Sequence, residues 1–154
     1  YFEEYSKTPF IKKITLLLRS KDKKSTYGIK IYEADENGKP AQLLHDNFIT
    51  GIAEKGYEKS QINLSELNIE FPKNGIVIVF EWLTIKDNLV EDSHDDEIRF
   101  KYNPSFEADE INNPNEALVK FSEIQTEWKT TTESKIIFNE NKAYSLMCEL
   151  TLTN

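Results

Sequence analysis

Several residue types are scarce in this chain, and each scarcity excludes something. A single cysteine, Cys148, among 154 residues rules out an internal disulfide. No apolar run approaches the roughly 18 residues that a membrane-spanning helix needs, and no signal peptide is recognisable. Five glycines and five prolines are too few for a low-complexity linker. Two histidines cannot form a histidine-rich zinc site.

Catalytic motifs are absent as well. There is no glycine-rich phosphate loop, no G-x-S-x-G and no H-E-x-x-H. Cys148 lies in an alternating apolar run, which predicts a small buried hydrophobe. A nucleophilic thiol would need a base, and neither His45 nor His94 lies in a partner motif. We therefore predict a protein that is not an enzyme and has no cofactor.

The charge is unevenly distributed. The chain has 27 acids against 19 bases, and residues 87–116 alone carry ten acids against two bases, which equals the whole excess of eight. An acidic protein repels phosphate backbones, so nucleic acid is not an expected partner. Residues 7–24 hold seven bases and one acid, which we interpret as a solvated strand face and turn.

The pattern of short apolar stretches separated by turn residues predicts an all-β fold. About eight to ten strands of this kind are typical of an antiparallel β-sandwich, here jelly-roll-like. We expect one domain over residues 1–154, a mature form or a domain excised from a longer envelope protein. The expected strands are 11–19, 27–34, 48–52, 57–64, 76–83, 98–102, 127–132, 136–138 and 144–152.

One expected strand stands out because it is apolar on both faces. Residues 76–83 contain a single charged side chain, Glu81, which predicts a central strand with Trp82 in the core. Turns are marked by Asn37-Gly38 and by Pro72 to Gly75. Beyond this strand, residues 87–97 are polar and acidic, which predicts an insertion or long loop.

Six short segments between Ile29 and Leu83 form an ordered series of turn and core signals. They are Ile31–Glu33, Asp35–Pro40, Leu43–Leu44, Asn63–Ile69, Phe71–Gly75 and Glu81–Leu83. The series resembles the β-sandwich module of carboxypeptidase-regulatory-like domain proteins, from the cell envelope of gut-type Gram-negative bacteria. It covers roughly a third to a half of the chain, which departs from the pattern after Leu83. The resemblance implies a non-catalytic β-sandwich and a cell-envelope setting.

The acidic stretch contains the candidate metal site. Clustered carboxylates in a sandwich loop can supply the hard oxygen ligands that calcium prefers, and Asp92, Asp95 and Asp96 are the residues we select. The spacing matches no EF-hand. The alternative is a solvated loop whose like charges keep it extended.

Aromatic side chains next to polar stretches are the candidate ligand contacts. Trp128, Tyr102 and Phe106 have this position, and a planar ring can stack on the apolar face of a sugar. The alternative is that these rings fill the interior of the sandwich.

These observations predict a non-catalytic, secreted or cell-envelope module for ligand binding or adhesion. A glycan is the favoured ligand by fold analogy, and a protein ligand is possible. The alternative is a structural domain that packs on a neighbouring domain, with an apolar patch near Tyr1-Phe2 and Pro9-Phe10. A third reading is a carboxylate-based glycoside hydrolase, in which Glu81 beside Trp82 is the candidate acid.

Overall fold

The computed structural model describes residues 5–94, 97–111, 117–120, 127–134 and 142–154. It is mostly antiparallel sheet, which confirms the predicted all-β sandwich. The chain divides into two compact units: unit 1 comprises residues 1–105 and 148–154, and unit 2 comprises residues 106–147. Among the described residues, no helix is long and apolar enough to cross a membrane.

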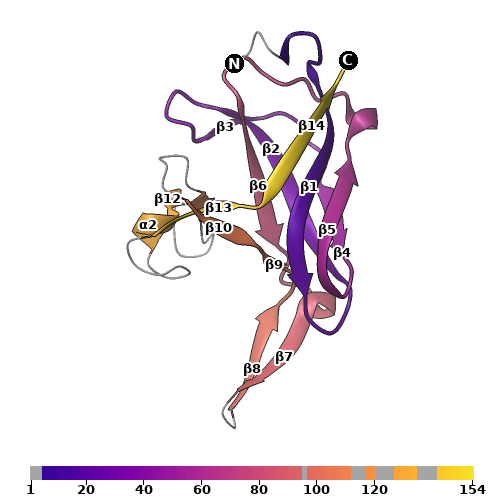
Figure 1. Cartoon of the computed structure of the whole chain (residues 1–154), viewed down its shortest axis with the longest axis vertical. Coiled ribbons are helices and arrows are strands. Elements are labelled where there is room, and N and C mark those ends of the chain that lie inside the picture. Colours follow the sequence, from indigo (N-terminus) through magenta and orange to yellow (C-terminus); the bar gives the residue numbers. More distant parts are fainter. Residues whose placement is uncertain (1–4, 95–96, 112–116, 121–126, 135–141) are drawn as a thin grey trace. The chain divides into compact units, whose positions relative to one another are not determined.

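The first sheet of unit 1 is built around one long strand. In Figure 1, β1 lies between β5 and β14, and both neighbours run antiparallel to it. Ile14 is opposite Ile62 on one side and Leu150 on the other. The three strands are β1 (Phe10–Ser20), β5 (Gly56–Asn63) and β14 (Cys148–Thr153).

The second sheet of unit 1 is built around β2 (Ser25–Ala34). One edge of β2 pairs with β6, and the other edge pairs with β4 and then β3. These partners are β3 (Pro40–Leu43), β4 (Ile49–Ala53) and β6 (Ile76–Trp82). Two short 3-10 helices, η1 (Ser65–Leu67) and η2 (Lys86–Asn88), lie in the connections. The predicted turn at Gly38 is confirmed: its φ is +73°, which glycine adopts without strain.

The core lies between the two sheets. Alternate residues of β1 and β2 are at most 1% exposed: Ile14, Leu16, Leu18, Tyr27, Ile29 and Ile31. Full burial of such a side chain stabilises the fold by roughly 1.5–3 kcal/mol. Tyr27 on β2 donates its hydroxyl hydrogen to Ser60 Oγ on β5 at 2.9 Å, so the two sheets are also joined by a buried hydrogen bond.

A glycine makes room for the largest core side chain. Gly51 on β4 lies opposite Tyr27 on β2, and a Cβ built on Gly51 would lie only 2.2 Å from Cζ of the tyrosine ring. The ring therefore covers the bare backbone of the neighbouring strand. Any side chain at position 51 would displace it.

Strand β6 is not the central strand that its sequence predicts. Within the described chain it pairs with β2 alone, its residues are half-buried, and Trp82 is 45% exposed. The prediction that Trp82 belongs to the core is therefore wrong. The indole is at the end of the strand, where its N–H donates to the Pro104 carbonyl at 2.7 Å. Because the indole N–H finds its hydrogen-bond partner at the end of the strand, the ring can remain partly exposed there.

Unit 2 is a smaller set of two-stranded ladders and one short helix. β10 (Ala108–Ile111) pairs with β13 (Ala143–Leu146), and β11 (Leu118–Val119) pairs with β12 (Lys129–Thr130), which leads into α2 (Thr131–Ser134). The predicted closing strand 144–152 is therefore wrong as one element. It breaks at Met147, whose N–H donates to the Glu107 carbonyl, and its halves join different units. The expected strand 136–138 is outside the described residues.

Candidate functional site

The acidic stretch forms a hairpin rather than the loop that its composition predicts. β7 (Leu89–His94) pairs antiparallel with β8 (Glu97–Tyr102), and Figure 1 shows the two strands as one two-stranded arm. Cross-strand pairing explains the difference, because Asp92 is opposite Arg99 and Glu91 is opposite Phe100. The acids of β7 therefore face cationic and apolar side chains instead of one another.

Asn88, directly before β7, ties the first end of the hairpin to the sandwich. Its side chain is completely buried. Oδ1 accepts the Thr26 N–H at 2.9 Å, while Nδ2 donates to the Thr26 carbonyl at 2.6 Å and the Leu83 carbonyl at 2.9 Å. The amide thus pairs with β2 as an extra ladder residue would.

Asn103, directly after β8, ties the second end. It is 1% exposed, and its Nδ2 donates to the Lys21 carbonyl at 2.7 Å and to Ser20 Oγ at 3.1 Å. Its own N–H donates to the Asn88 carbonyl at 2.9 Å. Both ends of the hairpin are therefore fixed by buried amides, and Val90 at its base is also buried, whereas Ile98 and Phe100 on β8 are largely exposed.

One face of the hairpin is apolar and open. Ile98, Phe100 and Tyr102 alternate along β8, so they share a face, and they are 67%, 66% and 39% exposed. Their cross-strand neighbours on β7 are Ser93, Glu91 and Leu89. Among the predicted contacts, Tyr102 is thus exposed on unit 1, as a ligand contact has to be. We call this surface the arm face.

The opposite face of the hairpin is charged. Asp92 Oδ1 accepts from Lys21 Nζ at 2.8 Å, and Oδ2 is 3.1 Å from Lys101 Nζ. Hydrogen bonds from Lys21 and Lys101 lower the pKa of Asp92 to about 2. The carboxylate therefore stays ionised at any physiological pH.

The predicted calcium site is only partly described. Both oxygens of Asp92 are engaged by ammonium groups, whereas Asp95 and Asp96 lie outside the described residues. In the described part of the chain, no group of three or more His, Cys, Asp or Glu side chains is placed to hold a metal ion. A calcium ion at Asp92 would have to displace two lysines.

The other two predicted contacts, Trp128 and Phe106, belong to unit 2. Both are half-buried. Lys120 Nζ lies 5.8 Å from the centroid of the Trp128 ring, a cation–π contact. One face of the indole is therefore already used within its own unit.

Glu81, the candidate acid of a hydrolase, forms an ion pair. Lys30 Nζ on β2 is 2.6 Å from Glu81 Oε1 on β6, and this hydrogen bond raises the pKa of Lys30. Gly28, opposite Glu81 in the ladder, is covered by the Phe48 ring, because a Cβ built on Gly28 would lie only 2.7 Å from Phe48 Cζ. The carboxylate is thus held by a cation, which is the ordinary structural role for a lone acid in an apolar strand.

Cys148 is exposed, so the prediction of a buried cysteine is wrong. It is the first residue of β14, at the point where the chain re-enters unit 1. Desolvation by the surrounding protein, together with the Glu149 charge, raises the pKa of the thiol to about 11. The thiol is accessible, but it remains protonated at neutral pH.

Sequence reasoning missed Ile98 and Phe100. The signal was present, because apolar and basic residues alternate strictly from Ile98 to Tyr102. Alternation indicates a strand with one apolar face, but it does not say that this face lacks a cover. Exposure depends on the hairpin projecting from the sandwich, which in turn depends on the buried amides at its ends.

Comparison with known proteins gave no match: no family model, no curated protein and no solved structure is similar to this chain.

Proposed function

We propose that this chain is a non-catalytic, secreted or cell-envelope β-sandwich module for ligand binding or adhesion, with the arm face as its contact surface. The observation that carries the proposal is the row of three large apolar side chains on β8, two of them about two-thirds exposed. Monomeric soluble proteins rarely expose contiguous apolar patches larger than a few hundred Å², and larger ones mark interaction sites. The secreted or envelope setting is supported by the sequence resemblance alone.

A glycan is the ligand class we favour for the arm face. Phe100 and Tyr102 are two residues apart on one strand face, so their Cα atoms are spaced by roughly 6.6–6.8 Å and both rings stand on the same side. Two planar rings at that spacing can each cover the C–H face of a sugar ring.

A panel of soluble glycans titrated against the purified protein tests this proposal. The variants Phe100→Ala and Tyr102→Ala should each weaken binding about tenfold, which corresponds to about 1.4 kcal/mol. Phe48→Ala is the matched control, because Phe48 is a 54% exposed aromatic elsewhere on unit 1. Equal losses for Phe48→Ala and Phe100→Ala, or no binding to any glycan, would reject the arm face as a glycan site.

A second candidate function is packing on a neighbouring protein domain. Ile98 favours it, because an aliphatic side chain at the most exposed position of the row gains from an apolar protein surface and offers no plane to a sugar. Of the terminal patch first expected, Pro9 and Phe10 are half-buried, and Tyr1-Phe2 lies outside the described residues.

Ile98→Ala separates the two candidates. It should leave glycan binding almost unchanged if the aromatic rings carry recognition. It should weaken association with a protein domain as much as Phe100→Ala does if the whole row is buried in an interface.

A further inference from the structure

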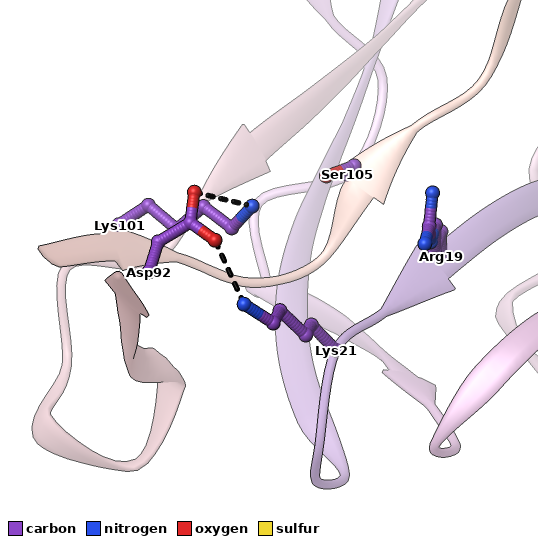
Figure 2. A pocket seen from close by; sticks show the side chains of 5 residues that line it. All are labelled: Arg19, Lys21, Asp92, Lys101 and Ser105. Carbon is purple, nitrogen blue, oxygen red and sulfur yellow. Dashed lines mark hydrogen bonds and ion pairs between the residues drawn. The ribbon is translucent and has the colours of Figure 1, made fainter. Parts of the chain in front are cut away.

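A small cavity in unit 1 lies beside the charged face of the hairpin. Its volume is about 200 Å³, and its lining comes from β1 and the turn after it, from both strands of the hairpin, and from Ser105. Arg19 is near the end of β1, Lys21 follows that strand, and Lys101 is on β8. Figure 2 shows Lys21 and Lys101 converging on Asp92, with Arg19 and Ser105 lining the same cavity. We call it the basic pocket.

The charges of the basic pocket do not balance. The lining holds three cations, Arg19, Lys21 and Lys101, and a single carboxylate, Asp92, so its own charge is +2 in a chain whose formal net charge is −8, and Asp22, outside the lining, also attracts Lys21. Among the described residues Arg19 forms no ion pair, and each lysine uses one of its three ammonium donors on Asp92. The basic pocket therefore has both unused hydrogen-bond donors and excess positive charge.

We propose that the basic pocket binds a dianionic oxyanion, a phosphate or sulfate group. Such a group matches the excess charge, and its oxygens can accept from the forked guanidinium of Arg19, the free donors of both lysines and the hydroxyl of Ser105. This inference does not depend on the arm face, which is the other side of the hairpin.

Asp92 has a defined role in this proposal. Its carboxylate holds Lys21 and Lys101 together in the absence of a ligand and competes with an incoming anion for their donors. Removing its charge leaves three cations in the lining with no carboxylate among them, and only Asp22, outside the lining, still attracts Lys21. An anion should then bind more tightly, whereas a purely structural ion pair predicts no gain in affinity.

The experiment is an NMR titration of backbone amides with inorganic sulfate and inorganic phosphate, with sodium chloride at matched ionic strength as reference. Melting temperature is a poor readout here, because sulfate stabilises folded proteins in general. We expect saturable shifts confined to the residues that line the basic pocket. A third titration uses glucose 6-phosphate. If the pocket recognises phosphate as part of a larger ligand, glucose 6-phosphate should bind more tightly than inorganic phosphate. If the pocket recognises the free anion, the two should bind equally well.

Two variants and one control make the result decisive. Arg19→Gln should weaken sulfate binding about fivefold or more, and Asp92→Asn should tighten it. Lys12→Gln removes the same charge from the same strand, seven residues or about 23 Å away, and should change nothing. Shifts that stay linear and spread over the surface would overturn the proposal, as would equal effects of Arg19→Gln and Lys12→Gln.

Discussion

The side chain of Asn88 replaces the hydrogen bonds that three backbone groups, one N–H and two carbonyls, would otherwise make with water. Asn88→Ala leaves the Thr26 N–H and carbonyl and the Leu83 carbonyl without these partners in a buried place. We expect a loss of about 3 kcal/mol in the free energy of unfolding, measured by denaturant titration.

Asn74→Ala is the control for Asn88→Ala. Asn74 donates to Glu33 Oε1 at 3.0 Å, but on the exposed surface, so its loss should cost no more than about 0.5 kcal/mol. Similar losses in the free energy of unfolding for the two variants would mean that the buried Asn88 amide contributes no more to stability than an exposed one.

Asp92 predicts a pH dependence with a definite sign. Its pKa is lowered from the ordinary 3.8 to about 2 in the folded chain, so the ion pairs stabilise the fold fully above about pH 4. Their contribution is lost as the pH falls from about 4 towards 2, because the unfolded chain then binds the proton more strongly. Asp92→Asn should therefore be less stable than the parent at neutral pH, by a difference that vanishes over this range.

Salt gives an independent check on Asp92. The side chain is 39% exposed, so added salt should shrink the difference between parent and variant. A difference in denaturant midpoint that is the same at pH 2 and pH 7 would contradict the ion-pair explanation.

Cys148 should react more slowly than its exposure suggests. Its pKa of about 11 instead of 9.0 reduces the thiolate fraction about a hundredfold, and the greater nucleophilicity of a more basic thiolate offsets part of this loss. We expect alkylation by iodoacetamide at pH 8 to be about tenfold slower than for a peptide of residues 145–151. Equal rates would show that the thiol is not desolvated.

At the scale of elements, the hairpin should be energetically separable from the sandwich. Ile98 and Phe100 are about two-thirds exposed, so the double variant Ile98→Ser with Phe100→Ser removes little buried area. We expect its free energy of unfolding to stay within about 0.5 kcal/mol of the parent. A loss several times larger, measured by denaturant titration, would mean that the row is covered by the chain itself.

The sequence predicted the elements better than their surroundings. Most of the described strands of unit 1 follow from alternation and turn residues, since both signals are local. The sequence does not locate Trp82, because an apolar run looks the same in a central strand and in a half-covered edge strand. Composition alone predicts a loop at Asp92, because its stabilising partners, Lys21 and Lys101, are distant in sequence or on the opposite strand, and composition does not reveal pairing.

At the scale of the whole molecule, unit 2 is inserted into unit 1 between neighbouring points. β14 pairs with β1 as far as Leu16, and β5 takes the other edge as far as Ser20. β9 (Ser105–Phe106) also pairs with β1, so Ser105 must lie beyond Leu16 on the edge that β14 uses. Ser105 and Cys148, where the chain leaves and re-enters unit 1, are therefore close together.

This geometry predicts that unit 1 folds without residues 106–147. A short Gly/Ser linker from Ser105 to Cys148 spans the gap, and loop closure costs little because it depends only weakly on loop length. We expect a single cooperative unfolding transition with a reduced denaturant dependence, monitored by circular dichroism. Loss of cooperative unfolding would instead support the prediction of one domain over residues 1–154.

The buried asparagines at the two ends of the hairpin have an evolutionary consequence. Asn88 and Asn103, with the buried Val90 and the Asp92–Lys21 ion pair, carry the attachment to the sandwich, so the outer part of the hairpin is released from the demands of the core. Insertions, deletions and replacements there can accumulate while the body of the protein stays the same. The hairpin is thus a natural graft point, at which a lineage can diversify what it recognises and an engineer can display a foreign peptide.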